Sequence, residues 1–523
     1  MVSPQLNVYK DKWKDLPFTG FGHSPVEQIR RQNWEQYAVN ILDRFDKREP
    51  ENVSLIADTG AGKTVIAHLV VIASGMRTLF LVPQRALTYQ HQILLDRMSD
   101  SMVHTRSITG LNKQIDRVWN DDSDQIVFAT PHIFVNDLKR GIVDINSFKL
   151  VIIDEFHKAT GDYPYVFAAD TAYQAGLKIL ALSASPGGDL EKVETVHHNC
   201  HIKHSLRARI ETPPKSEHLE VVPIGDKLKQ AEEYFLALLS DTAIDLELGG
   251  FVIDRSRVLT VKELNNLHTC IQGCERGSEY YEAISAYAKY MKLRHAFGLM
   301  MSESYGTFLK FVEKLKKDKS NAARRILKSS EFHQLVLIAD ANSGAHPKVN
   351  RLMGAIYGLA SKNHNALIFV AYKDTAKYLA ELIKQDGLTV EVVFGGRDKD
   401  LKHQQEVMDR ISRRDLDFVL ATSVVEEGIN VPEVDAVIHY SMPVTEVSRL
   451  QRSGRTGRLQ SGEVIYIAMD HFLDRGMYWG TRQRLQRMRQ LIDSDTALAS
   501  DETKQPTSKY RHKIDQTVLL PFR

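Results

Sequence analysis

The sequence predicts an α/β protein with two parallel-sheet units and an all-helical insertion between them. Short runs rich in Val, Ile and Leu alternate with helical patterns over residues 53–203, and the alternation returns at Asn365. Strands of this composition are typical of a parallel sheet that is covered by helices on both faces. Between about Thr212 and Lys348, long helical patterns dominate and predict the insertion.

The same alternation predicts the individual strands and the domain boundaries. The strands expected in the first unit are Ser54–Ala57, Thr78–Val82, Gln125–Ala129, Leu150–Ile153 and Lys178–Leu182. Those expected in the second unit are Ala366–Val370, Thr389–Phe394, Phe418–Ala421, Ala436–Tyr440 and Glu463–Ala468. The expected domains are an irregular lead-in (1–25), the first α/β unit (26–208), the insertion (209–348), the second α/β unit with an Arg-rich C-terminal helix (349–492) and a flexible tail (493–523).

The bulk composition indicates a soluble protein of a reducing compartment. Of the 523 residues, 43% are hydrophobic and 26% are charged, as in ordinary globular proteins. The formal net charge of +2 gives no global sign of nucleic-acid binding, so any basic surface must be local. Three cysteines argue against a disulfide framework, no apolar run approaches the ~20 residues of a membrane span, and the N-terminus lacks a signal peptide. We therefore expect a cytoplasmic protein, associated with the nucleoid if it is prokaryotic.

A phosphate-binding loop follows the first predicted strand. It reads Ala57-Asp58-Thr59-Gly60-Ala61-Gly62-Lys63-Thr64 and precedes a helix-like run. The amides of such a loop point at an anion, its lysine adds a positive charge, and its hydroxyl can ligate Mg²⁺. Residues 59–64 are therefore expected to bind the phosphates, with Thr64 as a ligand of Mg²⁺. Ala57 stands where the usual pattern begins with Gly, so the motif needs support from the rest of the chain.

A pair of carboxylates, Asp154 and Glu155, follows the apolar run that begins at Leu150. A carboxylate at the end of a buried strand can hold Mg²⁺ across from Thr64, and its neighbour can orient and deprotonate the attacking water. Taken alone, such a pair is more often a solvated strand end. In the same α/β unit as a phosphate loop, it predicts a site that hydrolyses a nucleoside triphosphate.

The second unit has no phosphate loop and carries an arginine-rich turn instead, Gln451-Arg452-Ser453-Gly454-Arg455-Thr456-Gly457-Arg458. The simpler interpretation is a basic turn on the surface. The more specific hypothesis is that Arg455 and Arg458 reach the γ-phosphate bound in the first unit and stabilise charge in the transition state. Hydrolysis would then be coupled to closing and opening of the two units.

In this order, the motifs make the chain similar to the superfamily 2 helicases, whose two lobes are RecA-like. Residues 59–64 resemble motif I, 154–157 the DEAH/DExH form of motif II, 183–187 motif III, 421–428 motif V and 451–458 motif VI. The resemblance implies adenine contacts for Arg31 and Gln36, a nucleotide contact for Gly428, and catalytic roles for Lys63, Asp154, Glu155, Gln451, Arg455 and Arg458. It also implies that His157, Ser183 and Ser185 couple hydrolysis to strand movement.

Four features are similar to the Hef and Fanconi anaemia group M branch of that superfamily. They are Ala184-Ser185-Pro186-Gly187, Gly428-Ile429-Asn430-Val431-Pro432, an insertion that ends near His346-Pro347-Lys348, and Tyr478-Trp479-Gly480-Thr481. The resemblance implies an ATP- and Mg²⁺-dependent DNA helicase that moves 3′→5′ on forked or branched DNA. Residues 480–523 lack the Glu-Arg-Lys-x-x-x-Asp nuclease core of Hef proteins, so we expect remodelling without cleavage. Two alternatives stay open: a double-stranded RNA-dependent ATPase of the RIG-I/Dicer type, and an ATP-switched scaffold that recruits a separate nuclease.

The nucleic-acid contacts are expected in loops at the surface of the two lobes, as the resemblance implies. The candidates are Arg85, Thr109, Gly110, Thr130 and Thr422. They would mostly touch phosphates, so binding should be largely sequence-independent and sensitive to salt. In the insertion, a cationic run that includes Lys316 and Arg324 is either a solvated helix face or a contact with the duplex backbone.

Two weaker signals remain. The stretch from His197 to His204 has a metal-like composition, and Cys270 and Cys274 form a loose pair, but neither has the spacing of a structural zinc site. The C-terminal Gln516-x-x-Leu519-x-x-Phe522 resembles the motif that binds the sliding clamp PCNA, although Arg523 replaces its second aromatic residue. We expect no metal at the first and a clamp partner as one interpretation of the second.

Overall fold

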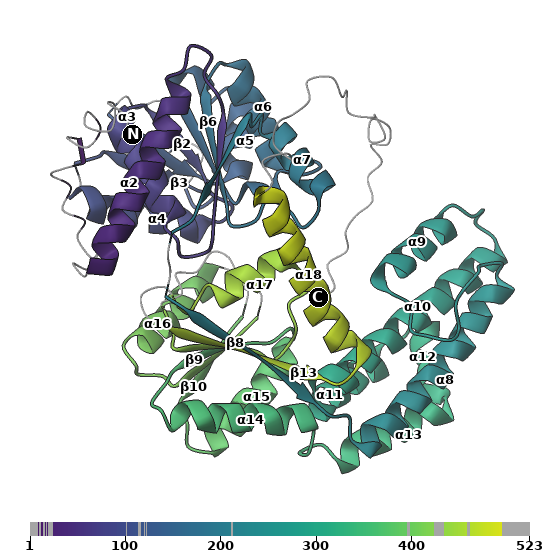
Figure 1. The fold of residues 1–523 in the computed structure, drawn as a ribbon. Coiled ribbons are helices and arrows are strands. Elements are labelled where there is room, and N and C mark those ends of the chain that lie inside the picture. The colour runs from purple at the N-terminus through teal and green to yellow at the C-terminus, as the bar shows by residue number, and fades with distance from the viewer. Residues whose placement is uncertain are drawn as a thin grey trace.

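The computed structural model describes residues 9, 12–13, 16, 18, 25–100, 102–112, 117–119, 121, 123–210, 213–394, 398–422, 433–457 and 461–493. They form two α/β lobes, stacked in Figure 1, with a helical domain beside the second lobe. We call residues 25–210 lobe 1, residues 226–341 the insertion, and residues 213–222 with 347–493 lobe 2. The expected fold class, two parallel-sheet lobes with an all-helical insertion, is confirmed.

Lobe 1 is built on a parallel sheet with the strand order β3-β4-β2-β5-β6-β1-β7. Its strands are β1 (Val53–Ala57), β2 (Thr78–Leu81), β3 (Thr105–Ile108), β4 (Ile126–Ala129), β5 (Leu150–Asp154), β6 (Lys178–Ser183) and β7 (His204–Ala208). Its helices are α2 (Pro25–Phe45), α3 (Lys63–Ser74), α4 (Arg85–Ser99), α5 (Pro131–Lys139), α6 (Pro164–Gln174) and α7 (Leu190–Asn199), with short 3-10 turns η2 (Ile145–Ser147) and η3 (Phe156–Lys158). Phe80 packs toward α2, α3 and α4, whereas Leu79 and Leu81 pack toward α5, α6 and α7. The helices thus cover both faces of the sheet.

Lobe 2 repeats this plan with the strand order β10-β11-β9-β12-β13-β8. Its strands are β8 (Lys215–Val222), β9 (Ala366–Phe369), β10 (Val390–Val393), β11 (Phe418–Ala421), β12 (Ala436–His439) and β13 (Gly462–Met469). Its helices are α14 (Pro347–Ala360), α15 (Lys373–Gln385), α16 (Asp398–Ser412), α17 (Glu446–Ser453) and α18 (Phe472–Asp493). In Figure 1, α18 runs from lobe 2 up to lobe 1.

The expected start of the insertion at residue 209 is wrong. Strand β8 lies inside the range expected to be helical, yet it pairs with the full length of β13, from Lys215 opposite Gly462 to Val222 opposite Met469. Lobe 2 therefore takes one strand from the chain before the insertion. The pattern concealed this strand because β8 is an edge strand with polar, half-exposed residues and no apolar run.

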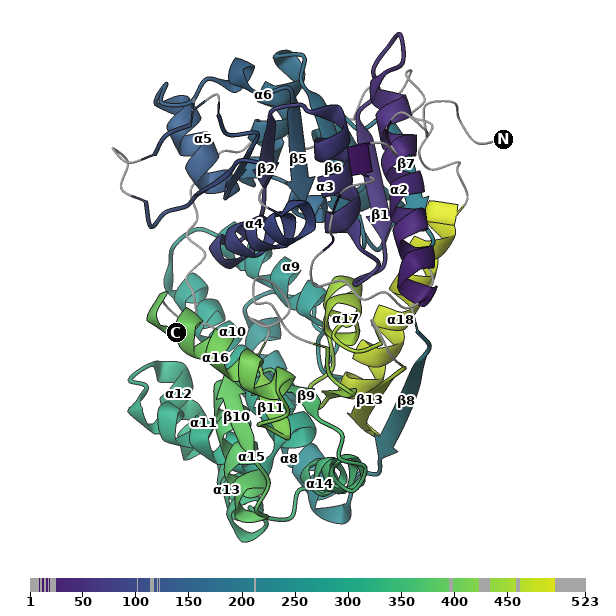
Figure 2. The ribbon, with the colours of Figure 1, turned by 90° about the vertical axis from the view of Figure 1, so that its left-hand side faces the viewer.

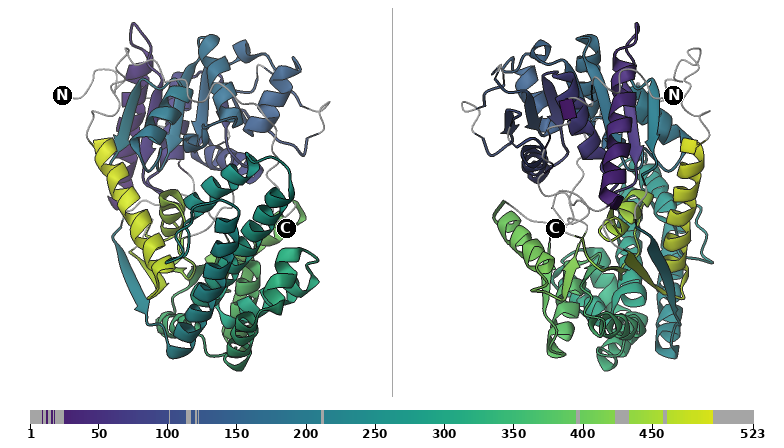
Figure 3. Two further views of the ribbon diagram at one scale, coloured as in Figure 1. Left: turned by 90° about the vertical axis from the view of Figure 1, so that its right-hand side faces the viewer. Right: turned by 60° about the vertical axis from the view of Figure 1, so that its left-hand side comes forward.

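The insertion packs along one side of lobe 2, as both views of Figure 3 show. Its elements are α8 (Asp226–Leu248), α9 (Val261–Gln272), α10 (Ser278–Gly298), the π-helix η4 (Leu299–Glu303), α11 (Tyr305–Lys317), α12 (Asn321–Lys328) and α13 (Ser330–Ala341). A single hydrophobic cluster joins these helices to lobe 2, with Phe235 and Phe297 on the insertion side and Ile368 and Ile438 on the sheet. The insertion is thus anchored to lobe 2 by a shared core.

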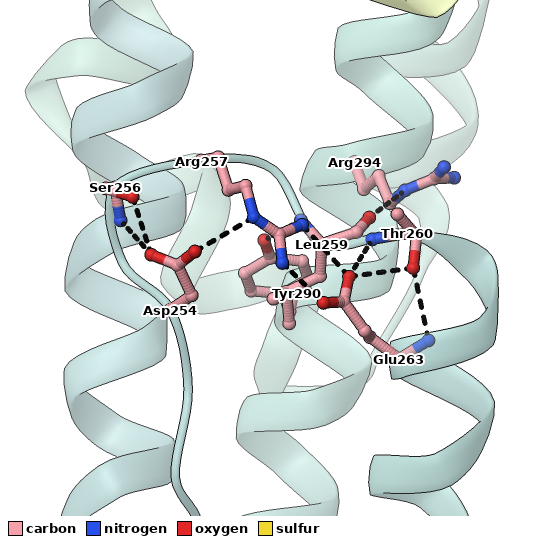
Figure 4. Close-up of polar contacts among 8 residues, drawn as sticks. All are labelled: Asp254, Ser256, Arg257, Leu259, Thr260, Glu263, Tyr290 and Arg294. Atoms are coloured by element: carbon pink, nitrogen blue, oxygen red, sulfur yellow. Dashed lines mark hydrogen bonds and ion pairs between the residues drawn. The ribbon is translucent and has the colours of Figure 1, made fainter. Parts of the chain in front are cut away.

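Polar contacts fix the loop between α8 and α9 (Figure 4). Arg257 Nε donates to Asp254 Oδ2 at 2.9 Å and Arg257 Nη1 donates to Glu263 Oε2 at 3.1 Å. The Leu259 N–H donates to the Tyr290 hydroxyl at 3.0 Å, and Arg294 Nε donates to the Leu259 carbonyl at 3.0 Å. The loop is therefore tied to both α9 and α10.

A buried polar network lies at the junction of the insertion and lobe 2. Lys348 Nζ is 2.6 Å from Asp474 Oδ2, and both side chains are at most 1% exposed. Lys348 also donates to the Ser302 carbonyl at 2.8 Å. Next to this pair, the Ser441 hydroxyl donates to Glu303 Oε1 at 2.7 Å. Burial raises the pKa of Glu303 to about 7, although the nearby Lys348 charge and the Ser441 hydrogen bond lower it.

We expect Glu303 to make folding less favourable as the pH rises from about 4.5 to about 7. In that range the unfolded chain has lost the proton of this carboxyl while the folded chain still holds it, so stability falls with increasing pH. Glu303→Gln removes the titration. As the pH rises through this range, its free energy of unfolding should therefore gain on the order of 3 kcal/mol relative to that of the wild type. Urea unfolding of both proteins at several pH values measures the difference, and parallel pH profiles would contradict the prediction.

Candidate functional site: the cleft between the lobes

The phosphate loop follows β1 and leads into α3. Gly60 has a φ of 85° and Gly62 a φ of 96°, a left-handed conformation that favours glycine. Helix α3 begins at Lys63, and its first turn contains no acidic residue. Lys63 Nζ donates to the Ala57 carbonyl at 2.9 Å, which holds the ammonium group across the loop.

Helix α2 lies against this loop through two side chains one turn apart. Trp34 Nε1 donates to the Ala61 carbonyl at 2.7 Å, and Arg30 Nη2 donates to the Gly60 carbonyl at 2.8 Å. A Cβ atom at Gly62 would lie 2.3 Å from Trp34 Nε1, so the tryptophan leaves room only for glycine. Gly62 thus has a local reason that the sequence pattern did not reveal.

Arg31 and Gln36, for which the resemblance implies adenine contacts, lie on other sides of α2. Arg31 pairs with Glu35 at 3.1 Å and donates to the Trp13 carbonyl, while Gln36 donates to Asn40 on the exposed side of α2. Neither side chain points at the phosphate loop in these contacts. The buried stripe of α2 (Trp34, Ala38, Ile41, Leu42, Phe45) could have identified Trp34, and Arg30 four residues before it, as the residues that face α3.

The carboxylates expected to be catalytic lie at the end of β5. Glu155 has a φ of 52°, and its Oε2 is 3.1 Å from His157 Nδ1. Burial alone would raise the pKa of Glu155, but the hydrogen bond and charge of His157 and the charges of Lys63 and Lys158 lower it below the ordinary value. Glu155 is therefore ionised at neutral pH, and Lys63 is close enough to contribute.

The three residues expected to couple hydrolysis to movement form a continuous line of contacts. His157 Nδ1 is 3.2 Å from the Ser183 hydroxyl, which donates to the Ser185 carbonyl at 2.9 Å. The Ser185 hydroxyl is 2.6 Å from the sulfur of Met488 on α18. The line therefore runs from motif II of lobe 1 to a helix of lobe 2.

Motif VI of lobe 2 lies directly against the phosphate loop, beneath β1 in Figure 2. A Cβ atom at Gly454 would be 2.5 Å from Cβ of Thr59, so the backbone of this turn touches the loop. Gln451 is buried on α17, and Arg455 follows the contact. Arg458 and Gly428 lie outside the described residues.

We expect Gly454→Ala to separate the two lobes. The added methyl group cannot fit against Thr59 or the Leu450 carbonyl, which would be 3.0 Å away, so the turn must withdraw from the phosphate loop. Nucleotide hydrolysis should fall about tenfold or more because Arg455 withdraws with the turn. Steady-state ATPase assays test this, with Gly476→Ala on α18 as the matched control because its Cβ would meet nothing within 4 Å. Equal turnover of both variants would contradict the prediction.

The strand order separates two halves of one sheet edge in lobe 1. The phosphate loop follows β1, Ser183 ends β6 and Asp154 ends β5. These three strands are neighbours, and we call their part of the edge the phosphate half. The residues expected to contact nucleic acid follow β2, β3 and β4, which form the other half of the edge; they are Arg85, Thr109, Gly110 and Thr130. We call this part the nucleic-acid half. Parallel strands place all these residues at the same edge.

The other expected nucleic-acid residues lie in lobe 2 and the insertion. Thr422 follows β11 and donates its N–H to the Val393 carbonyl at the end of β10, so it lies at the corresponding edge of lobe 2. Lys316 is exposed on α11 and pairs with Glu313 at 2.7 Å, and Arg324 is exposed on α12. The insertion cations are thus remote in sequence from both sheet edges and partly paired.

The histidine-rich segment has a structural role. His197 is buried, with Nε2 2.9 Å from the Ser205 hydroxyl and 3.2 Å from the Ser54 hydroxyl, so it ties α7 to β7 and β1. His201 stacks on Tyr173 and contacts Asp170. Within the described part of the chain, no group of three or more His, Cys, Asp or Glu could hold a metal ion. Gln516, Leu519 and Phe522 of the clamp-like motif lie outside it.

The residues of the cleft fit ATP and Mg²⁺. Thr59 Oγ1 is buried at the contact between the lobes and has no hydrogen-bond partner among the described residues. A polar group of a bound ligand would satisfy this hydroxyl. The N-terminus of α3 and Lys63 suit a phosphate group. Thr64, in the first turn of α3, and Asp154, at the end of β5, are oxygen donors of the kind that Mg²⁺ prefers.

Comparison with known proteins agrees with this geometry. Residues 36–193 match the DEAD/DEAH box helicase family, and residues 347–460 match the helicase conserved C-terminal domain. The helicase domain of Pyrococcus furiosus Hef superposes with a TM-score of 0.63 at 25% identity, covering 85% of this chain and 98% of that one. A Methanocaldococcus jannaschii protein, provisionally named an ATP-dependent RNA helicase, is 28% identical over 84% of this chain and 58% of its own length. The mouse Fanconi anemia group M protein homolog is 27% identical over 80% of this chain and 24% of its own length.

The chain belongs to the superfamily 2 helicases of the DEAD/DEAH box type, a family of ATP-dependent helicases. Within it, the chain belongs to the branch of archaeal Hef and the Fanconi anaemia group M helicase. It spans between about a quarter and about three fifths of the curated relatives named above. Among the described residues, no helix has the length and apolar character needed to cross a membrane.

Proposed function

We propose that the chain is an ATP-dependent DNA helicase or translocase of the DExH type that moves 3′→5′ and remodels forked or branched DNA. The observation that supports this most is the division of the lobe 1 edge into a phosphate half and a nucleic-acid half, with motif VI of lobe 2 against the phosphate half. When bound nucleotide draws the two lobes together at the phosphate half, the surfaces that hold the nucleic-acid strand at the other half would move as well.

Each residue of the cleft has a part in this proposal. Lys63 and the loop amides bind phosphate oxygens, and Glu155, which is ionised, orients the attacking water. Mg²⁺ held by Thr64 and Asp154 would neutralise phosphate charge when bound. Arg455, and Arg458 beyond the described residues, would stabilise charge from lobe 2.

Nucleic-acid binding in this proposal is mainly to phosphates. Arg85, Gly110, Thr130 and Thr422 lie beyond the carboxyl ends of β2, β3, β4 and β11, where backbone and side chains can contact a nucleic-acid strand without reading its bases. Binding should therefore weaken steeply with salt. A sliding clamp of the PCNA type is the partner that we propose for Gln516, Leu519 and Phe522.

A panel of nucleic acids tests the proposed function. ATP hydrolysis and strand displacement are measured with a DNA fork, a flap, a Holliday junction and an RNA duplex. We expect the branched DNA substrates to stimulate hydrolysis and to be unwound, with polarity read from forks that carry a single 3′ or 5′ arm. The name of the Methanocaldococcus relative favours RNA as the second candidate, so stimulation by the RNA duplex alone would overturn the DNA assignment. Stimulation without strand displacement would favour a scaffold.

A further inference from the structure

A buried cluster of two histidines and two phenylalanines lies beneath Asp154. His91 of α4 is 6% exposed, and its ring lies 4.9 Å from Phe80 and 6.2 Å from Phe128 between ring centroids. His68 of α3 is fully buried and meets the His91 ring edge-on at 6.1 Å. The cluster therefore fills the space between α3, α4 and strands β2 and β4, next to the end of β5.

One atom of this cluster contacts the cleft. His91 Nε2 is 3.4 Å from Asp154 Oδ2. The other ring nitrogen, Nδ1, is buried and has no hydrogen-bond partner among the described residues, and neither nitrogen of His68 has one. A neutral His91 ring is therefore best accommodated with its proton on Nε2, where it can donate to the carboxylate. The phenylalanines hold the ring, so the ring in turn restricts where Asp154 can point.

Helix α4 connects this contact to the nucleic-acid half of the edge. The helix begins at Arg85, and six residues at 1.5 Å each place His91 about 9 Å along the same rigid element. Gln92, beside His91, donates to the Thr105 hydroxyl at 3.0 Å and accepts from the Ser107 hydroxyl at 2.7 Å. Both partners belong to β3, which leads to Thr109 and Gly110. Helix α4 and the ends of β2 and β3 should therefore move together.

We propose that His91 is a positioning residue that orients Asp154 and links it to the nucleic-acid half of lobe 1. Nucleic acid bound at Arg85 and Gly110 shifts α4, the His91 ring follows, and the Asp154 carboxylate changes its fit to the divalent cation that accompanies the nucleotide. The link to nucleic acid rests on the proposed function. The orientation of Asp154 by His91 does not, because it depends only on the contact between the two side chains.

The test compares three variants of the full chain by nucleotide binding, without turnover. His91→Phe keeps an aromatic ring in the cluster and removes the donor, whereas His91→Gln replaces the ring by an amide that can donate from a similar position. His68→Phe changes the same cluster at a residue whose ring contacts are with Phe80, His91 and Phe128. Fluorescent ADP is titrated with Mg²⁺ in the presence and absence of the DNA fork, and thermal melting checks that each variant is folded.

We expect His91→Phe to raise the half-saturating Mg²⁺ concentration about tenfold, as removal of a group that orients a metal ligand does elsewhere. The same variant should lose the effect of the fork on Mg²⁺-dependent binding. His91→Gln should stay within about twofold of the wild type, and His68→Phe should behave like the wild type. An unchanged Mg²⁺ dependence in His91→Phe would overturn the proposal, and so would an equal loss in His68→Phe, which would indicate packing alone.

The design separates this proposal from the proposed function. A wild-type protein that does not respond to the fork or to an RNA duplex would overturn the nucleic-acid link and the helicase function together. The Mg²⁺ shift of His91→Phe would still decide whether His91 orients Asp154. A wild-type response that survives intact in His91→Phe would overturn only the link through α4.

Discussion

Lys63→Ala and Glu155→Gln are each expected to lower nucleic-acid-stimulated ATP hydrolysis by at least about a hundredfold. Lys63 supplies the charge beside the phosphate loop, and loss of such a preorganised group removes stabilisation of the transition state directly. Glu155 is held ionised by His157, Lys63 and Lys158, and an amide in its place can no longer take a proton from water. Steady-state turnover at saturating nucleic acid measures both effects.

The matched control is Gln174→Ala, at an exposed side chain of α6 that donates to Asp170. It should retain turnover within about twofold, because surface substitutions of this kind seldom disturb the fold. Circular dichroism and melting curves show whether the two cleft variants remain folded. Turnover of both variants close to that of the wild type would contradict the assignment of the cleft. A comparable loss of turnover in Gln174→Ala would also contradict it.

Asp474→Asn is expected to destabilise lobe 2 by about 3–5 kcal/mol. It leaves the Lys348 ammonium group in a fully buried position without its carboxylate, while the amide oxygen can still accept from the Met469 N–H, which now lies 2.9 Å from Asp474 Oδ2. The Lys348 side chain is fully buried and also lies over the Tyr440 ring, so water cannot replace the lost carboxylate without local opening. Unfolding in urea, followed by the transition of lobe 2 and the insertion, measures the loss.

A second substitution shows that the loss comes from the uncompensated charge. Lys348→Met in the Asp474→Asn background removes the ammonium group and should recover most of the stability, because a buried pair can often be replaced by apolar side chains. Glu391→Gln is the surface control: its partner Arg410 is about half exposed, so the change should stay within about 1 kcal/mol. A double variant as unstable as Asp474→Asn alone would contradict this account of the junction.

The central strands of both sheets could be predicted because their environment is uniform. Strands β1, β5, β9 and β12 have every residue buried, so they require continuous apolar runs that are visible in the sequence. The three strands that the pattern missed, β3, β7 and β8, are all edges of their sheets. Edge strands face water on one side and tolerate polar residues, so their burial gives no such signal.

The residues that gather in the cleft could be predicted from the sequence to a similar degree. Short motifs fix which residues follow which strand, and the parallel sheet then gathers Lys63, Asp154 and Ser183 at one edge. What the sequence could not supply is contact between segments that are far apart along the chain. The fit of Trp34 over Gly62 and of Gly454 against Thr59 depends on packing distances of a few ångström.

The sequence by itself therefore determined the two-lobed α/β class, the central strands and the order of the helicase motifs, because each leaves a local pattern of apolar residues, glycines or charges. The tertiary structure alone decided which side of α2 meets the phosphate loop, which strand lobe 2 takes from before the insertion, and where His91 lies. Those features depend on side chains brought together from distant segments, and a local sequence pattern does not indicate which distant residues become neighbours.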